Sequence, residues 1–115
     1  MRFSDSLKKN SDFKKVYNKG TSYANRLLVM YCLENGTKQN RIGISVSKKV
    51  GNSVVRHRLT RLVRESYRLQ EDMFNSGLDI VVILRVNAKE SVYHEIESAL
   101  LHLGNLHNVI LKKHT

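Results

Sequence analysis

The stretch RIGISVSKKVGNSVVRHRLTRLVRES (Arg41–Ser66) decides the fold, because it joins two different hydrophobic periods across one short loop. Its first residues alternate between apolar side chains and small or polar ones, which predicts a strand over Arg41–Ser47. The loop Lys48–Asn52 then leads into a helix of about 20 residues, for which Asn52 or Ser53 is a suitable cap. The sequence thus predicts a strand, a basic loop and a long helix in direct succession.

The residues before this stretch predict a helix followed by a strand. A short helix is expected to start at Ser11 or Asp12, either of which is a suitable cap, and to end at Gly20. The apolar run Arg26–Glu34 predicts a strand, and the Asn35-Gly36 pair that follows it predicts a reversal of the chain.

The residues after the long helix predict a buried strand and a last helix. Asp79–Val86 is almost continuously apolar and β-branched, as expected of a strand that is covered on both faces. Asn87 followed by Glu90 is typical of a helix start, and Gly104 is a suitable end for that helix. The predicted order is therefore α-β-β-α-β-α, in a single α+β domain over residues 1–115 with helices packed on a small mixed sheet.

The composition indicates a polyanion as the partner. The chain has 115 residues and a net charge of +10, and residues 38–68 alone hold nine Lys or Arg against one acid. This excess favours nucleic acid over an anionic membrane surface. No apolar run approaches the roughly 20 residues of a membrane span. The lone Cys32 excludes an internal disulfide and favours a reducing compartment, so we expect a cytoplasmic protein.

The long helix carries apolar and basic residues on opposite faces. Helical spacing predicts an apolar face made of Val55, Leu59, Leu62, Ser66 and Leu69. The opposite face holds a basic row about 16 Å long, with further arginines at its edges: His57, Arg61, Arg64 and Arg68 in the row, Arg56 and Arg58 beside it. Lys48 and Lys49 precede the helix N-terminus, where free N–H groups and the helix dipole already favour an anion. A row without interleaved acids favours RNA phosphates over simple solvation.

These features, in this order, resemble the bacterial ribonuclease P protein subunit. The strand, the segment SKKVGNSV and the basic helix are similar to the signature region of that family. DFKKVYNKGTSYANRLLVMY (Asp12–Tyr31) is similar to its opening helix and first long strand, and the later DIVVILR followed by a helix also matches. The resemblance covers nearly the whole chain. It implies a ribosomal S5 domain 2-like fold, with a left-handed strand–helix–strand crossover where the general rule is right-handed.

The resemblance also implies a function. The family's protein joins a large catalytic RNA, and the complex removes the 5′ leader of precursor tRNA by phosphodiester hydrolysis. The chemistry is implied to belong to the RNA and its Mg²⁺ ions. We therefore expect a 1:1 complex with the catalytic RNA, leader binding, a lowered Mg²⁺ requirement and a broadened substrate range. We expect no catalytic residue, cofactor or metal site in the protein itself, and no protein partner or membrane.

The resemblance extends to individual binding residues. The positions that match the RNA-contacting motif of the family are Lys48, Lys49, Arg56, Arg58, Arg61 and Arg64, and the helix face adds His57 and Arg68. Two positions depart from the pattern, since His57 stands where the family has Asn and Thr60 where Lys is common. A histidine still donates a hydrogen bond and stacks on bases, and the arginines are intact.

Three aromatic residues are candidates for a leader-binding cleft. A basic groove with aromatic platforms is the usual way to hold single-stranded RNA, and Phe13, Tyr17 and Tyr31 match the family's cleft positions. From the residues alone, burial of all three in the core is an equally good interpretation. If the strand of Tyr31 pairs with the strand over 41–47, small residues complete the cleft beside basic ones: Ser45, Ser47, Lys14 and Arg26.

Two other functions remain as alternatives. One is a ribosomal-type protein that binds rRNA without processing it. The other is an autonomous protein nuclease, suggested by His57 within the basic row. The sequence has neither a DxD nor an HExxH motif, and its acids are scattered, whereas a protein nuclease needs clustered acids or an acid–base constellation.

Overall fold

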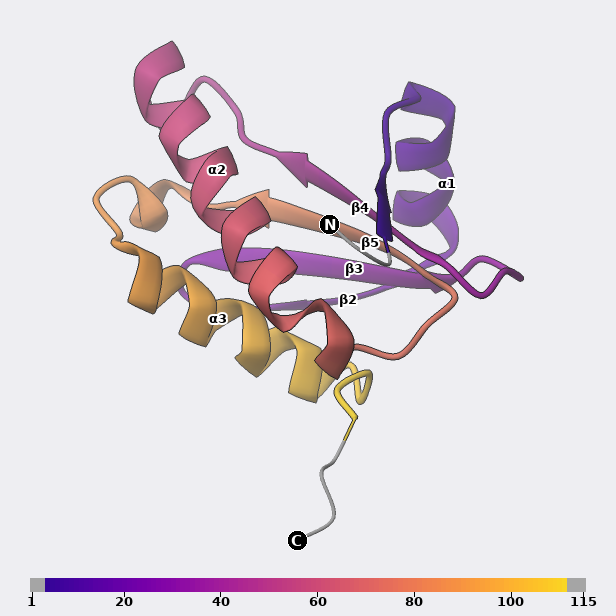
Figure 1. Cartoon of the computed structure of the whole chain (residues 1–115). Coiled ribbons are helices and arrows are strands. Elements are labelled where there is room, and N and C mark those ends of the chain that lie inside the picture. Colours follow the sequence, from indigo (N-terminus) through magenta and orange to yellow (C-terminus); the bar gives the residue numbers. More distant parts are fainter. Residues whose placement is uncertain (1–3, 112–115) are drawn as a thin grey trace, which may run out of the picture.

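One five-stranded sheet organises the chain, with helices on both of its faces (Figure 1). The computed structural model describes residues 4–111. The strands are β1 (Ser4–Ser6), β2 (Thr21–Ala24), β3 (Leu28–Glu34), β4 (Asn40–Ser45) and β5 (Leu78–Leu84). The helices are α1 (Asn10–Lys19), α2 (Ser53–Gln70) and α3 (Tyr93–Leu106), with short 3₁₀ turns η1 (Glu71–Met73) and η2 (Val86–Ala88).

The sheet is mixed, in the order β1-β4-β5-β3-β2. The strands β1, β4 and β5 are mutually parallel, whereas β3 runs antiparallel to both β5 and β2. Helix α2 connects β4 to β5 across the sheet. Figure 1 looks onto the α2 side, where β4 lies above β5 and both run from right to left, so this crossover is left-handed.

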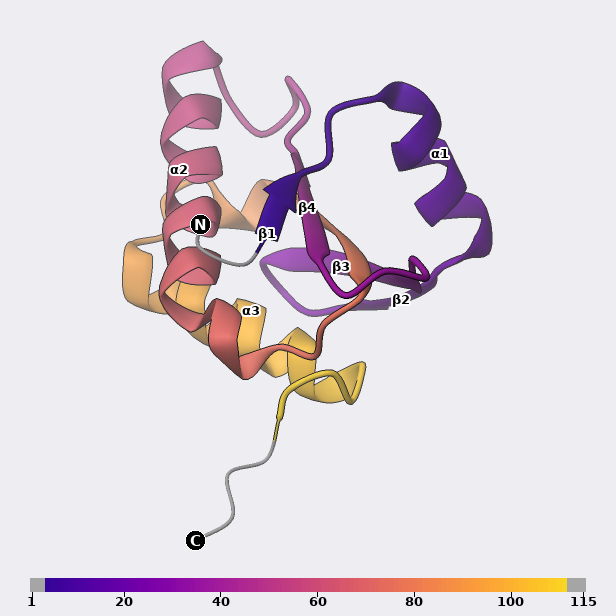
Figure 2. The same ribbon diagram turned by 45° about the vertical axis from the view of Figure 1, so that its right-hand side comes forward.

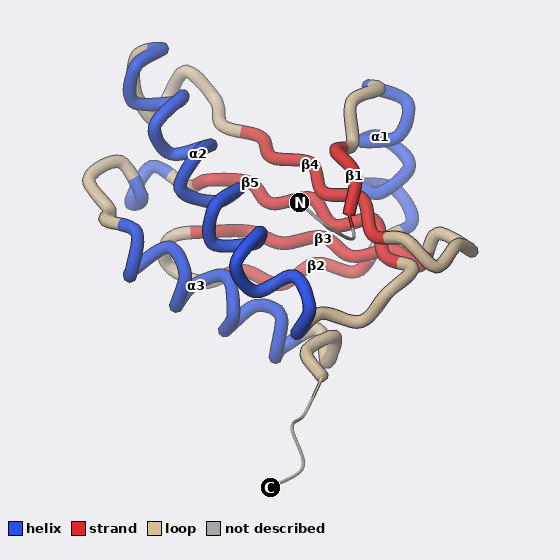
Figure 3. The backbone as a smooth tube through the Cα atoms, in the orientation of Figure 1, coloured by secondary structure: helices blue, strands red, loops and turns tan. Residues whose placement is uncertain are grey.

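The sheet separates a large hydrophobic cluster from a small one. Helices α2 and α3 lie side by side on one face, as the tube in Figure 3 shows, and cover Met30, Ile80 and Val82. Helix α1 lies on the opposite face, which Figure 2 shows from the side, and its Val16 packs on Val81. The central strand β5 is thus covered on both faces, as its apolar sequence predicts.

The predicted order of the main elements is confirmed, but two edge strands escape the sequence pattern. Strand β1 has three residues, and all four residues of β2 are exposed, so neither shows the alternation that identifies a half-buried strand. The first strand of the predicted pair begins at Leu28 rather than Arg26. The reversal at Asn35-Gly36 exists, with Gly36 at a φ of 72°, but it does not make a hairpin because β5 lies between β3 and β4.

The predicted apolar face of the long helix is rotated slightly in the structure. Leu59 and Ser66 are buried as expected, but so are Val63 and Tyr67, whereas Leu69 is 50% exposed. Leu69 lies in the last turn of α2, on the side of the helix that faces solvent. The Tyr67 hydroxyl explains part of the shift, since it is buried with hydrogen-bond partners in Ser4 (2.8 Å) and Asn40 (3.2 Å).

Two predicted helix starts are wrong. Helix α1 starts at Asn10 and neither Ser11 nor Asp12 caps it, although Gly20 ends it as expected. The last helix does not start at Asn87, which lies in η2, but at Tyr93, where the Glu95 carboxylate accepts a hydrogen bond from the Val92 N–H (3.1 Å).

Gly104 does not end α3, which continues to Leu106. It is buried within the helix, and a Cβ at this position would lie 2.6 Å from the Ile110 Cδ1 and 3.2 Å from the Phe74 ring. The glycine therefore serves close packing of the C-terminal segment rather than a cap.

The cap of the long helix gives a first prediction. The Asn52 side chain accepts a hydrogen bond from the Val55 N–H at 3.0 Å, as the sequence predicts. We expect Asn52→Ala to lower the free energy of unfolding by about 1 kcal/mol, because an N–H group of the first turn loses its acceptor. Urea unfolding followed by circular dichroism measures this, with Ser53→Ala as the neighbouring control. Equal losses in the two variants would contradict a specific role of the Asn52 cap.

Candidate nucleic-acid interface

The centre of the basic row on α2 is open to solvent. His57, Arg61 and Arg64 are exposed, and within residues 4–111 the guanidinium groups of Arg61 and Arg64 make no hydrogen bond or ion pair. The buried face of the same helix holds them outward, because Leu59 and Val63 pack into the core one turn apart. These three side chains, here called the basic row, therefore present unsatisfied donors on a rigid support.

The C-terminal end of the predicted row is neutralised by the protein itself. Arg68 donates through Nε to the Glu65 carboxylate at 3.0 Å, and its Nη2 donates to the other oxygen. This pairing lowers the pKa of Glu65 and raises that of Arg68. The expected alignment of Arg68 with the row is right, but its charge is shared with an acid on the same helix, so the uncompensated part of the row is shorter than the sequence predicts.

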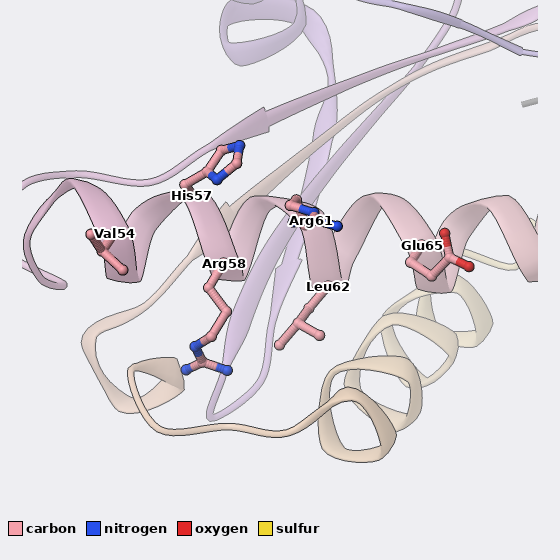
Figure 4. A pocket seen from close by; sticks show the side chains of 6 residues that line it. All are labelled: Val54, His57, Arg58, Arg61, Leu62 and Glu65. Atoms are coloured by element: carbon pink, nitrogen blue, oxygen red, sulfur yellow. The ribbon is translucent and has the colours of Figure 1, made fainter.

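The two flanking arginines are also placed differently from each other. The Arg58 guanidinium donates to the carbonyl oxygens of Ser91 (2.9 Å) and Lys89 (2.6 Å), which ties α2 to the loop before α3. Arg56 is half-buried. Figure 4 shows the resulting division on α2, where His57 and Arg61 point to one side and Arg58 points to the other, toward this loop.

A shallow hollow of about 440 Å³ runs along this part of α2 (Figure 4). Its lining combines basic groups with apolar ones and a single acid: Val54, His57, Arg58, Arg61, Leu62 and Glu65. Lys48 and Lys49 are exposed in the loop that enters the helix, near the N–H groups of its first turn. The surface thus offers cations and free N–H groups along one line, which suits a phosphate backbone.

The three candidate aromatics meet on the other face of the sheet. The Tyr17 ring is 6.3 Å from the Phe13 ring and 5.1 Å from the Tyr31 ring, measured between centroids. Burial raises the pKa of the Tyr17 hydroxyl, and the neighbouring Ser45 side chain offsets part of the rise. Phe13 and Tyr31 are half-buried and Tyr17 is 36% exposed, so the group is neither core nor free surface.

The floor of this aromatic group differs from the predicted one. Tyr31 does not pair with the strand of Gly43 directly, because Val81 of β5 lies between them and is in register with both. A Cβ on Gly43 would lie 2.6 Å from the Phe13 Cζ, so the glycine makes room for this ring. Five residues, here called the aromatic cleft after their predicted role, therefore come from three elements around β5: Phe13 and Tyr17 from α1, Tyr31 from β3, and Gly43 and Ser45 from β4.

The remaining residues expected at the cleft lie around it or elsewhere. Lys14 is exposed on α1, and Ser47 is exposed just beyond the end of β4. Arg26 is not part of the group: it lies in a hollow of the α3 side, with His94, Glu95 and His102. The loop between β2 and β3 turns Arg26 toward α3, a geometry that follows from the unforeseen strand β2.

An ion-pair cluster that the sequence did not reveal lies beside the cleft. Arg41 donates to both carboxylate oxygens of Asp79, at 2.9 and 2.7 Å, and to Asp12 of α1 at 3.3 Å. Asn35 adds a hydrogen bond to Asp79 at 3.0 Å. Burial would raise the pKa of Asp79, but the hydrogen bonds from Arg41 and Asn35 hold it below its ordinary value. The sequence signal that could have revealed this cluster is the pair of opposite charges, Arg41 and Asp79, at the second positions of β4 and β5.

Among the described residues, few side chains are arranged for catalysis by the protein itself. Among residues 4–111, no group of three His, Cys, Asp or Glu side chains is arranged to hold a metal ion. Cys32 is buried, and burial raises the pKa of its thiol to about 12, so it is a poor nucleophile at neutral pH. No helix in the same part of the chain is long and apolar enough to cross a membrane.

Comparisons with known proteins agree on one family. The family model of ribonuclease P matches residues 1–106. The ribonuclease P protein component of Lachnoclostridium phytofermentans is 58% identical over 107 residues, which cover 93% of this chain and 92% of that protein. That of Alkaliphilus metalliredigens is 59% identical over 103 residues, covering 90% and 93%.

Solved structures agree with the sequence matches. The Staphylococcus aureus ribonuclease P protein superposes with a TM-score of 0.86 at 38% identity, covering 93% of this chain and 98% of that one. The Thermotoga maritima protein superposes with a TM-score of 0.81 at 30% identity, covering 88% and 96%. With the basic row on one face and the aromatic cleft on the other, the chain belongs to the ribonuclease P protein family and is a subunit of a tRNA-processing endoribonuclease whose activity is that of the holoenzyme.

Proposed function

We propose that this subunit holds two RNA segments on two surfaces: the catalytic RNA on the basic row, and the 5′ leader of precursor tRNA in the aromatic cleft. The assembly contains one protein for each catalytic RNA and acts in the cytoplasm. The observation that carries the proposal is the separation of the two surfaces. Exposed guanidinium groups lie on α2, whereas neighbouring, partly accessible aromatic rings of α1 and β3 lie on the opposite face of the sheet.

Each surface has the chemistry of its proposed ligand. Arg61 and Arg64 offer planar, bidentate donors to the phosphates of a folded RNA without ordering a flexible segment first. Tyr17 and Tyr31 offer ring faces to unpaired bases, and base–aromatic stacking tolerates any sequence, as the leaders of different tRNAs require. Lys48, Lys49 and Arg56 extend the first surface beyond the basic row, and Lys14 and Ser47 border the second. Arg58 and Arg68 contribute less to binding because both are engaged within the protein.

The hydrolysis itself is assigned to the RNA and its Mg²⁺ ions. The protein's own contribution is to raise the local concentration of the leader next to the RNA and to screen phosphate repulsion, which lowers the Mg²⁺ requirement. A protein-catalysed alternative has only His57 to offer, and no acid of the described residues forms a hydrogen bond with it.

Reconstitution tests this proposal. The protein is combined with a bacterial ribonuclease P RNA at low Mg²⁺, and cleavage is measured on precursor tRNAs that differ only in leader length. We expect a large rise in the cleavage rate over RNA alone, and an affinity that increases with leader length until the cleft is filled. The protein without RNA is the control for intrinsic nuclease activity. A rate that is independent of leader length would contradict leader binding, and cleavage by the protein alone would support the nuclease.

A further inference from the structure

The short helix α1 needs more than its hydrophobic contacts to hold the aromatic cleft in shape. It has ten residues, of which only Val16 is fully buried. Val16 fixes how closely the helix approaches the sheet, and the partly buried Phe13 ring over Gly43 is the main hydrophobic contact beside it, so rotation of α1 depends on few side chains. Phe13 and Tyr17 lie on either side of Val16 in the sequence, so any such rotation moves both cleft rings relative to Tyr31.

A second anchor lies one turn before Val16. Asp12 of α1 contacts the Arg41 guanidinium at 3.3 Å, and Arg41 is itself held by the bidentate contact to Asp79. The Asp79 side chain is only 3% exposed, with Asn35 bound to the same oxygen that accepts from the Arg41 Nε. Asp79 is therefore fixed in the sheet, and Arg41 transmits that fixed position to the helix.

We propose that Arg41, held by Asp79, is a positioning residue for leader binding: it fixes α1, and thus the rings of Phe13 and Tyr17, over the sheet. The role rests on the proposed leader-binding function of the cleft. Arg41 acts through α1, because its Nε and Nη2 are held by Asp79 of the sheet while its Nη1 contacts Asp12 of the helix. The ion-pair cluster of Arg41, Asp79 and Asp12, which the family resemblance did not indicate, thereby contributes to specificity for leader-bearing substrates.

The direction in which one substitution changes the affinity for the leader separates a positioning role of Arg41 from a direct contact. In Asp79→Asn the protein gains one positive charge, and Arg41 loses its bidentate acceptor. If Arg41 were a phosphate contact, release from Asp79 would strengthen binding of the leader. If Arg41 positions α1, the leader-dependent part of the affinity falls, by about tenfold, because the released guanidinium no longer orients the helix.

The experiment compares holoenzymes reconstituted with each variant, on precursor tRNA with a long leader and on the same tRNA with a one-nucleotide leader. We expect Asp79→Asn and Arg41→Ala to lose affinity for the long-leader substrate only, and their combination to lose no more than either alone. Affinity of the protein for the catalytic RNA is measured in parallel and remains unchanged.

Two further variants keep the test independent of folding. Asp12→Asn removes the partly exposed end of the network without unfolding risk and is expected to lose about threefold of the leader-dependent affinity. Tyr67→Phe removes a buried hydroxyl on the opposite face and serves as the control for lost stability, with unfolding by urea measured for every variant.

The outcomes distinguish the two proposals. If the wild type shows no dependence on leader length, the proposed function fails. If the wild type shows it and Asp79→Asn retains or increases it, the positioning role of Arg41 is wrong. An equal loss in Tyr67→Phe would reduce the effect to general destabilisation and would likewise overturn the inference.

Discussion

Replacing Arg61 and Arg64 together by Ala lowers the affinity for the catalytic RNA by about 100-fold at moderate salt, since each guanidinium–phosphate hydrogen bond contributes roughly 1.5 kcal/mol. Both side chains are exposed and make no hydrogen bond or ion pair within residues 4–111, and Glu65 interacts with Arg61 only through its charge, so the loss of affinity reports mainly on contacts to RNA. The fold is unaffected, because Ala is a better helix former than Arg and neither side chain contributes to the core.

The salt dependence makes this prediction specific. Each lost phosphate contact removes about one unit from the slope of log affinity against log salt concentration, so the double variant loses about two units. The measurement is a filter-binding or fluorescence titration of the catalytic RNA at four or more salt concentrations. The slope separates a loss of direct phosphate contacts from a change in the structure of the protein surface.

A matched control removes the same net charge elsewhere. Lys19 ends α1 and Lys38 lies in the loop between β3 and β4, and both are exposed and outside the hollow that the basic row lines. We expect Lys19→Ala with Lys38→Ala to change the slope by less than half as much. Equal changes in the two double variants would show that only total charge matters, and the basic row would lose its assignment.

The part of the fold that the sequence predicts well is the part with strong periodicity. The alternation over 41–47, the cap at Asn52 and the apolar run of β5 each have one good physical solution, and the structure adopts it. The edge strands β1 and β2 have no such pattern, because residues that bury little show little periodicity. Consequently the sequence predicts the main elements but not that β5 lies between β3 and β4.

The candidate site is likewise predicted where helical periodicity determines it and not where neighbouring side chains do. Helical geometry alone aligns His57, Arg61 and Arg64, since residues three and four apart share a face. It does not show that Arg58 turns to the loop before α3 or that Arg68 pairs with Glu65, because these depend on neighbours and rotamers. The prediction that Arg26 lines the cleft is wrong for a related reason: the strands that a loop connects determine the path of the loop.

The aromatic cleft is distinguished from a core face only when the family resemblance and the structure are combined. Phe13 and Tyr17 are four residues apart on a helix, which is equally typical of a core face. What distinguishes the cleft from the core is the size of the apolar cluster beneath α1: among residues 4–111 its buried members are Leu7, Val16 and Val81. With so little core available on this face, aromatic rings stay at the surface, where they can stack on a ligand.

Removing the two cleft tyrosines has the second large effect that we expect. Tyr17→Ala with Tyr31→Ala lowers the affinity for leader-bearing precursor tRNA by about 30-fold in the reconstituted holoenzyme, because each stacked base contributes about 1–3 kcal/mol. Affinity for mature tRNA, which has no leader, changes by less than threefold, since the tRNA body does not enter the cleft. Equilibrium binding of both RNAs to the same holoenzyme preparation gives the two values.

Conservative variants separate the rings from their hydroxyls. Tyr17→Phe with Tyr31→Phe keeps the stacking surfaces and removes only the two hydroxyl groups, so we expect it to retain most of the leader-dependent affinity. Tyr23→Ala is the control for a lost surface aromatic, because Tyr23 is 42% exposed on β2 and contacts His107 instead of the cleft. If the Ala double variant weakened precursor and mature tRNA equally, the tyrosines would belong to the support of the fold, and the leader would have to bind elsewhere on the protein.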